Sequence, residues 1–382
     1  MAYEIGTAIG SALNNDTSGH KVLLNAIRTF VETTLPIAER WIPVRTLNNT
    51  LGTVVSLAFS GTTATITMGS DPLLSVGDFV SVTGASDAYF NGYFVVTASN
   101  PNDLTFTYTM IGTPASAGMG SVTANRGCWE SIWKAPGLSG DDEIFMGIKT
   151  YQSPTSDYYN FKVMVCTGYI ANNTFETQAG SSPIMGVCLW NQNIPYWFVG
   201  NGQKLIVVAK VENVYESFYI GKYLPYATPS QYPYPVCVGA NLSSASATRY
   251  SDTARFSWFK GAIGSATTLV LRSAGGTYKT PDVFPFYQGT TLGTDTSTYT
   301  WTTRQLRNTA SLSITADGYY GLHSLVMSTN EPNVFGELEG IYYISGFNNA
   351  VENTIIWEGI TYVVLRDVLR TGFNDYVAIR LQ

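Results

Sequence analysis

Residues 196–211 read YWFVGNGQKLIVVAKV and carry the clearest strand signal in the chain. Two apolar runs, Tyr196–Val199 and Lys204–Val211, flank Asn201-Gly202. This dipeptide favours a tight hairpin, because a type I′ turn needs positive φ at both of its central positions. We therefore predict a β-hairpin here. Similar runs rich in β-branched and aromatic residues predict strands through most of residues 126–382.

The composition restricts the classes of partner. Only 13% of the 382 residues are charged, against about 25% in an average soluble domain. The net charge is −6, and the 21 Lys and Arg residues are scattered singly, whereas a phosphate-binding face needs clustered cations. We therefore expect no nucleic-acid partner. No apolar run reaches the roughly 18 residues of a membrane span, and the first residues lack the features of a signal peptide.

Residues 19–39 carry the clearest helix signal. Thr17 or Ser18 is a suitable N-cap, and Pro36 is expected to end or kink the helix. Residues 1–16 are small and polar and are predicted to form an extended arm. The apolar stripe must dock either on a sheet of the same chain or on a neighbouring subunit; it consists of Leu23, Leu24, Ile27, Phe30, Val31 and Leu35.

Residues 51–125 differ in composition from the rest of the chain. Short runs rich in Thr, Ser and Val alternate with turn sequences such as Ser60-Gly61 and Asn91-Gly92. The spacing predicts a small β-sandwich or barrel. There is no His, Cys, Lys or Arg between Arg45 and Arg126, so this module has almost no catalytic side chains available.

Candidates for chemistry are few. The histidines are His20, expected to be solvated at the helix start, and His323, expected to be buried. Nucleophile-elbow, P-loop and zinc-protease motifs are absent. We predict no catalytic residue, no cofactor site and no metal site. The cysteines lack metal-site spacing and are expected to be buried free thiols; they are Cys128, Cys166, Cys188 and Cys237.

Two acidic features and one aromatic group are the remaining candidates. Asp141-Asp142-Glu143 could hold a cation, or could be an exposed turn. Glu337 and Glu339 share one strand face and could form a glycosidase pair, or an ordinary polar face. The aromatics either form a binding surface or fill the core; they are Tyr158, Tyr159, Tyr196, Trp197, Tyr215, Phe218, Tyr219, Tyr223 and Tyr226.

Several motifs resemble those of a family of uncharacterised virion structural proteins of tailed bacteriophages. They are MAYEIGTA (1–8), KAPGLSGDDEI (134–144), NIPYWFV (193–199), YLPYATPSQYPYP (223–235) and GELEGIYY (336–343). The resemblance covers residues 1–45 and 126–382. Residues 51–125, with LSVGDFV (74–80) and FTY (106–108), resemble an Ig-like module inserted into many phage proteins.

The strand and helix signals predict an all-β fold, with a large β-sandwich, a second small sandwich and one N-terminal helix, and the resemblance implies that the small sandwich is an inserted Ig-like module. The expected divisions are 1–50 (arm and helix), 51–125 (module) and 126–382 (main domain). The expected function is a structural subunit of a tailed-phage virion in the tail or baseplate region, without enzymatic activity. The alternatives are a carbohydrate-binding receptor-recognition protein, a head or collar decoration protein, and a polysaccharide-degrading enzyme that would use Glu337 or Glu339.

The expected partners are other virion proteins, copies of the same chain and a host surface glycan. Assembly would take place in the bacterial cytoplasm, followed by residence in the virion. The predicted contact residues come from the helix stripe and from the Pro/Tyr block. They are Leu23, Ile27, Phe30, Val31, Tyr226, Tyr232 and Tyr234.

Overall fold

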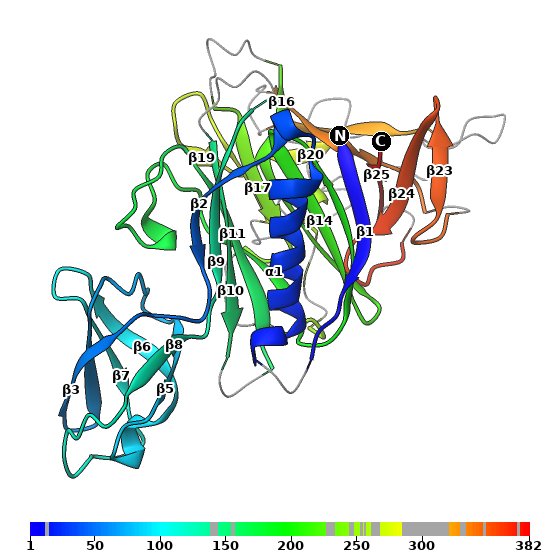
Figure 1. Cartoon of the computed structure of the whole chain (residues 1–382). Helices are drawn as coiled ribbons and strands as arrows, with labels where there is room; N and C mark the ends of the chain where they lie inside the picture. Colours follow the sequence, from blue (N-terminus) through cyan, green and yellow to red (C-terminus); the bar gives the residue numbers. More distant parts are fainter. Residues whose placement is uncertain are drawn as a thin grey trace, which may run out of the picture.

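The computed structural model describes residues 1–11, 15–137, 144–153, 157–226, 234–243, 248–252, 255, 257–260, 268–284, 321–328, 334–346, 349–372 and 375–382. The strands of these described residues pair antiparallel. The predicted all-β chain with one N-terminal α-helix is confirmed (Figure 1).

The body of the protein is built around one sheet, here called the central sheet. Its strands, in spatial order, are β1 (Ala2–Ala8), β13 (Ile194–Gly200), β14 (Lys204–Val211), β15 (Val214–Lys222), β17 (Val236–Ala240), β18 (Leu269–Arg272) and β19 (Tyr278–Lys279). Alternate residues point to opposite faces. On β14, Leu205 and Val207 enter one hydrophobic core, whereas Ile206 and Val208 enter another. The central sheet is therefore buried on both faces along its middle strands.

A second sheet, the helix-side sheet, covers one of these faces. Its strands are β12 (Met185–Leu189), β11 (Tyr159–Cys166), β10 (Ile144–Gln152), β9 (Glu130–Ala135) and β2 (Ile42–Leu47). The Phe161 ring meets the Phe218 ring of the central sheet edge to face, with ring centroids 6.5 Å apart. Such aromatic contacts between sheets contribute beyond simple area burial.

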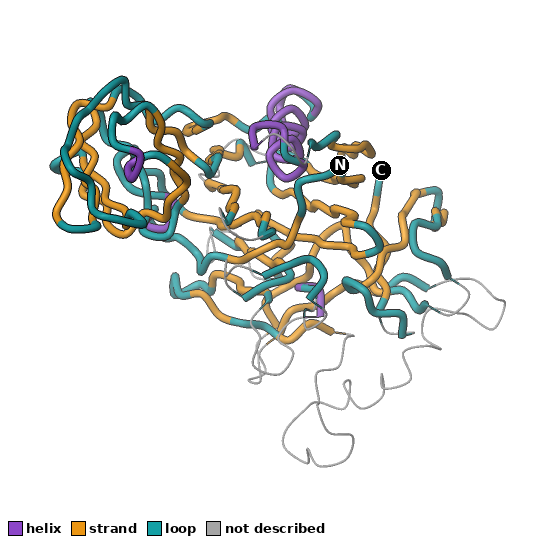
Figure 2. The backbone as a smooth tube through the Cα atoms, turned by 90° about the horizontal axis from the view of Figure 1, so that it is seen from below, coloured by secondary structure: helices purple, strands orange, loops and turns teal. Residues whose placement is uncertain are grey.

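A third sheet, the C-terminal sheet, covers the opposite face. Its strands are β20 (Asp282–Phe284), β21 (His323–Ser328), β22 (Val334–Tyr343), β25 (Tyr376–Arg380), β24 (Ile360–Arg366) and β23 (Thr354–Trp357), and β16 (Leu224–Pro225) pairs with β22. The main part of the chain thus stacks three layers of sheet, one more than a two-sheet sandwich. The two chain ends lie near each other in both backbone views (Figures 1 and 2).

The N-terminal helix is shorter than the predicted span. An α-helix, α1 (Gly19–Thr29), continues as a π-helical turn over Phe30–Thr34. The Leu35 N–H donates to the Phe30 carbonyl five residues back, at 3.0 Å. This wider turn keeps Leu35 on the buried side together with Val31. Pro36 ends the helix as expected, and the short 3-10 turn Ile37–Glu39 follows.

The helix cap differs from the prediction. Ser18 is the N-cap residue, but its side chain makes no cap hydrogen bond. The free N–H groups of Gly19 and His20 instead donate to the carbonyls of Asn191 and Trp190, at 2.7 and 3.1 Å. A loop remote in sequence therefore satisfies the helix start.

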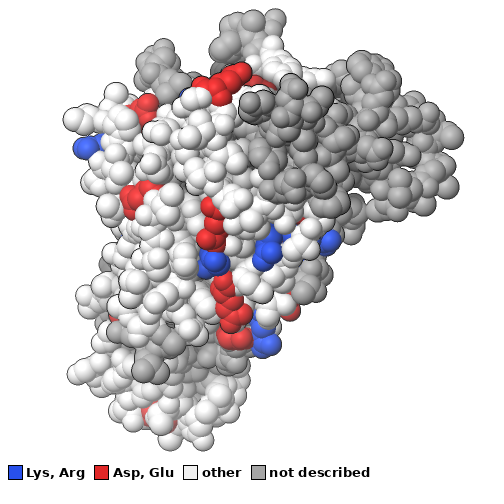
Figure 3. Space-filling model, turned by 90° about the vertical axis from the view of Figure 1, so that its right-hand side faces the viewer, with Lys and Arg blue, Asp and Glu red and all other residues white. Residues whose placement is uncertain are grey.

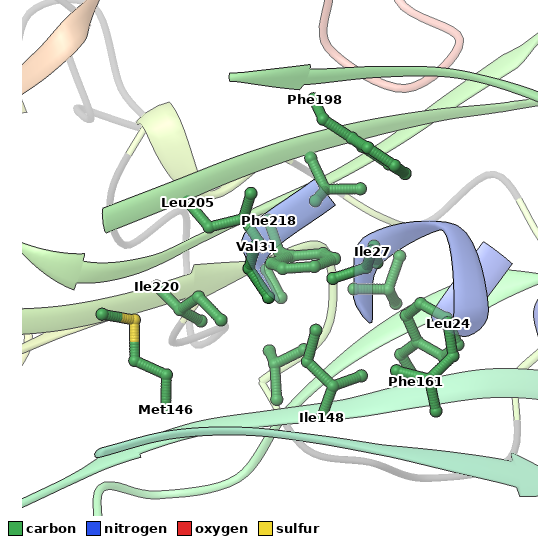
Figure 4. Close-up of a cluster of buried hydrophobic side chains, with 14 of the residues drawn as sticks. Leu24, Ile27, Val31, Met146, Ile148, Phe161, Phe198, Leu205, Phe218 and Ile220 are labelled. Carbon is green, nitrogen blue, oxygen red and sulfur yellow. The ribbon is translucent and has the colours of Figure 1, made fainter. Parts of the chain in front are cut away.

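The prediction of a partner contact for the helix stripe is wrong. Leu23, Ile27, Phe30 and Val31 are fully buried in the chain's own core. Figure 4 shows Leu24, Ile27 and Val31 packed among side chains of both sheets, namely Phe161 and Ile148 of the helix-side sheet and Phe198, Leu205 and Phe218 of the central sheet. The helix contacts β1 and β13, as well as β10 and β11. It completes the layer that covers the central sheet, as the alternative hypothesis proposed.

The predicted N-terminal arm is also ordered within the chain. Residues Ala2–Ala8 form β1 and pair with β13 in one unbroken register, from Ala2 opposite Gly200 to Ala8 opposite Ile194. Strand pairing uses backbone hydrogen bonds, which do not depend on large apolar side chains. The small, polar composition of this segment therefore misled the prediction.

Residues of the module form a sheet and a core of their own. The strands are β3 (Val54–Ser60), β4 (Thr63–Met68), β7 (Thr105–Thr109), β6 (Gly92–Asn100), β5 (Phe79–Thr83) and β8 (Thr123–Arg126), and the short helix Ala88–Phe90 lies in one connection. Their core is separate from the two cores of the central sheet. Thr50 and Asn125 form an isolated β-bridge where the chain enters and leaves. Independent folding of the module stays a prediction.

The hairpin at residues 196–211 is confirmed, but its turn type is not. The Asn201 N–H donates to the Lys204 carbonyl at 3.1 Å, which places Gly202 and Gln203 at the turn centre. Neither Asn201 nor Gly202 has positive φ, so the turn is not type I′. The Asn201 Oδ1 accepts from the Gln203 N–H at 2.8 Å, which stabilises the turn locally. A Cβ on Gly202 would lie 2.8 Å from the Gly137 carbonyl oxygen, so close approach requires glycine.

The buried helix stripe leads to a stability prediction. Ile27→Ala should lower the free energy of unfolding by about 2–5 kcal/mol, because it removes fully buried methyl groups and leaves a cavity. Thermal and denaturant unfolding of the purified chain would measure this loss. The matched control is Ile37→Ala, since the Ile37 side chain is 82% exposed. An unchanged melting temperature for Ile27→Ala would contradict the buried position.

Candidate functional site

A group of buried and half-buried charges lies where the module meets the body. We call Asp78, Lys149, Lys162 and Glu176 the junction cluster. Asp78 directly precedes β5 of the module, and the two lysines lie on β10 and β11. Glu176 lies in the 3-10 turn Phe175–Thr177. The cluster therefore joins a module loop to the helix-side sheet.

The carboxylates of the junction cluster compensate an unfavourable pair of lysines on neighbouring strands. Lys149 and Lys162 are directly opposite each other in the β10–β11 register, and like charges in that position repel. The Lys149 Nζ lies 2.8 Å from the Asp78 Oδ2 and 3.5 Å from the Glu176 Oε1. The Lys162 Nζ lies 3.1 Å from the same Glu176 oxygen. Two carboxylates thus neutralise two lysines.

The module contributes more than one bond to this junction. The Ser75 hydroxyl donates to the Glu176 Oε2 at 2.5 Å. The Ser75 N–H donates to the Asp78 Oδ2 at 2.8 Å, so the acceptor is fixed by its own loop. The Phe79 ring meets the Tyr151 ring edge to face, with centroids 5.3 Å apart. Polar and aromatic contacts therefore hold the same loop against the body.

Two arginines extend the junction on either side. The Arg45 Nη1 donates to the Glu130 Oε1 at 3.0 Å, and its Nη2 donates to the carbonyls of Ala171 and Asn173. Arg126, at the end of β8, donates to the carbonyls of Pro72 and Leu73. The Arg126 guanidinium therefore fixes the loop that precedes Asp78.

The pKa shifts follow from these contacts. Burial would lower the pKa of Lys149, but Asp78 and Glu176 together raise it above its ordinary value. Burial would raise the pKa of Glu176, but Lys149 and Lys162 lower it to about 2. Burial raises the pKa of the nearby Cys128 thiol. At neutral pH Lys149 therefore carries its proton, Glu176 is ionised and the Cys128 thiol is protonated.

The junction is not evident from the sequence, although the two lysines give a signal of it. Lys149 and Lys162 each stand alone within strongly apolar strands, which indicates a buried charge that needs a partner. In the sequence, Asp78 follows Gly77 and looks like an ordinary turn residue. Its role as partner depends on a contact across 71 positions in sequence.

The predicted aromatic surface divides between core and surface. The buried members are Tyr196, Trp197, Tyr215, Phe218, Tyr219 and Tyr223. Tyr226 is 57% exposed beside β22, so its ring is accessible to a partner. Tyr234 is half-buried against the core, with the Arg272 guanidinium 5.4 Å from its ring centroid. Tyr232 lies outside the described residues.

The other candidates also have defined positions. His20 is fully buried rather than solvated, and burial, with Lys21 beside it, holds its pKa well below the ordinary value. His323 is half-buried near the Tyr343 ring.

Glu339 is paired with Lys204 of the central sheet, whereas Glu337 lies opposite Leu224. Asp141-Asp142-Glu143 lies outside the described residues. The four cysteines are buried free thiols, as predicted.

Within the described residues, no cluster of three or more His, Cys, Asp or Glu residues could hold a metal ion. Over the same residues, no helix is both long enough and apolar enough to cross a membrane.

Comparisons with known proteins give little direct guidance. No family model matches the chain, and no curated protein matches it. Among solved structures, the chain is similar to the endosialidase of phage phi92, with 10% identity and a TM-score of 0.18. That alignment covers 85% of this chain and 66% of the endosialidase chain, so this chain spans just under two thirds of its length. A TM-score this low carries no argument about activity or fold.

The junction predicts a coupling between module and body. In the full chain, Lys149→Met should lower the free energy of unfolding by about 3–5 kcal/mol, because it leaves Asp78 buried without its cation. In a chain that lacks residues 51–125, Asp78 is absent and the same substitution should cost much less. Denaturant unfolding of the four proteins measures the difference.

The matched control for this cycle is Lys279→Met, because Lys279 is exposed on β19, away from the junction. The deletion should leave the body folded, since neither core of the central sheet contains a module side chain. Equal losses for Lys149→Met in both chains would contradict the coupling.

The Glu176 carboxyl predicts acid sensitivity. Its pKa is about 2 in the folded protein, against about 4.3 in an unfolded chain. A carboxyl whose pKa is lowered by folding stabilises the protein above the unfolded value and loses that contribution as pH falls to the folded value. Between about pH 5 and pH 2, the loss of stability should be smaller in Glu176→Gln than in the native chain. Exposed Glu358→Gln serves as the control in Trp-fluorescence denaturation series, and identical curves for Glu176→Gln and the native chain would contradict the role of Glu176.

Proposed function

We propose that this protein is a structural subunit of a tailed-bacteriophage virion, in the tail or baseplate region, and that it acts through protein contacts rather than through catalysis. One observation carries the proposal: buried charged side chains of the described chain serve to fasten one layer to another. Lys149 joins the body to the module, and Lys204 joins the central sheet to the C-terminal sheet. Removing the carboxylate partner of a buried lysine is costly, so these pairs help to specify position.

The surface supports the same proposal. Large apolar side chains are exposed on strand edges and loops, such as Ile111 at 93% on the module. Figure 3 shows one side of the molecule, on which most visible described atoms are uncharged and the charged side chains are few. Static interfaces favour aromatic and apolar side chains over charges in their centres. The motifs that resemble those of virion structural proteins are the reason for proposing a place in the virion.

A density map of the virion whose genome encodes the chain, together with mass spectrometry of purified particles, tests the proposal. We expect the chain in a fixed number of copies at an ordered position in the tail or baseplate. Absence of the chain from purified particles would refute a virion role. An ordered position on the head or collar would refute the tail assignment and favour the decoration alternative.

The exposed Tyr226 ring favours one second candidate, a receptor-recognition protein that binds a host glycan. That function predicts glycan-array binding by the purified chain and its loss in Tyr226→Ala. Structural assembly alone predicts no glycan binding and normal incorporation of the same variant.

A further inference from the structure

Strand β1 is an edge of the central sheet. Its described partner is β13 on one side, and no described strand pairs with its other side. Tyr3 and Ile5 are 43% and 53% exposed on one face, and Thr7 continues that row. On the other face Glu4 accepts a hydrogen bond from the Tyr196 hydroxyl at 2.8 Å, so its charge is turned toward the helix side.

Edge strands of folded proteins are usually protected against pairing with another chain. The other described sheet edges carry such protection. β19 and β20 have two and three residues, whereas β2 and β3 contain register shifts, with Pro43 in β2. β8 and β23 have four residues each, and β12 is fully buried. β1 has seven residues in an unbroken register, with no proline, no lysine and no charge on its exposed face.

We propose that β1 is a self-association edge, which pairs antiparallel with β1 of a second copy of this chain about a twofold axis at Ile5. This register pairs all seven residues, because Ile5 is the midpoint of Ala2–Ala8. It sets Ile5 opposite Ile5 of the second copy and Tyr3 opposite Thr7. Such aromatic and β-branched cross-strand pairs stabilise a sheet.

Charge favours a second copy in this register. Glu4 is the only charged residue of β1. Centring the pair on Ile5 sets Glu4 opposite Gly6 of the second copy, whereas centring it on Glu4 would oppose two carboxylates. The β1 sequence is therefore complementary to itself in the register that also gives full overlap. The interface is isologous, as expected for a twofold dimer.

This inference rests on the proposed role as an assembling subunit, and it names one contact that such a subunit would use. It is testable without a virion, because it concerns the purified chain. Disulfide trapping suits the test, since the four native cysteines are buried. Residues directly opposite in an antiparallel pair have Cα atoms about 4.5–5.5 Å apart, within the span that a disulfide bridges.

The experiment oxidises single-cysteine variants of the full chain with copper phenanthroline and air. Ile5→Cys should convert largely to a covalent dimer on non-reducing gels. Thr7→Cys alone should stay monomeric, because it faces residue 3 of the second copy, but an equimolar mixture of Thr7→Cys and Tyr3→Cys should give the heterodimer. Ile111→Cys, 93% exposed on the module, controls for random collision.

Sedimentation gives an independent measurement under reducing conditions. The native chain should show a concentration-dependent dimer, which Ile5→Lys abolishes without changing the melting temperature and which mixing Ile5→Lys with Ile5→Glu restores. A native chain that stays monomeric to its solubility limit, or equal cross-linking of Ile5→Cys, Thr7→Cys and Ile111→Cys, would overturn the β1 pairing. Virion incorporation is measured separately, so an incorporated native chain that never dimerises would refute only the β1 inference.

Discussion

Burial of the central sheet on both faces is the constraint on which the rest of the structure depends. A sheet with two buried faces needs two covering layers, because each face is driven out of water by its apolar side chains. Here the covering layers come from distant parts of the chain. The helix-side sheet and α1 cover one face, and the C-terminal sheet covers the other. The apolar stripe of the helix is buried in this covering layer, so it is not available to a partner.

The same constraint explains the few charges and their positions. A charged side chain within a stack of three sheets must find an opposite charge from a neighbouring layer or loop. Lys204 finds Glu339 on the C-terminal sheet, and Lys149 finds Asp78 on the module. Each such pair adds little net stability, but losing the carboxylate leaves a buried lysine without that partner. The ion pairs therefore act mainly to specify how the layers and the module fit together.

This arrangement connects the fold with the proposed function. The buried lysines form ion pairs inside the protein, whereas some large apolar side chains are exposed on strand edges and loops. Such a molecule is suited to lasting contacts with neighbours, since its outer contacts need little desolvation of charge. The module would add a second contact surface, held at a fixed place by the junction cluster. β1 is the edge at which the central sheet could continue into another copy.

The sequence by itself determined the all-β class, the single N-terminal helix, the hairpin at residues 196–211 and the buried cysteines. These features depend on local signals, such as turn dipeptides, a period of two or 3.6 residues, and composition. Only the tertiary structure decided which surface receives the Leu23 and Ile27 stripe, because an apolar stripe fits any apolar surface equally well. The pairing of Ala2–Ala8 with β13 was also decided there, since backbone hydrogen bonds leave no trace in side-chain composition. The junction of Asp78 with Lys149 depends on a long-range contact between two residues that look unrelated in the sequence.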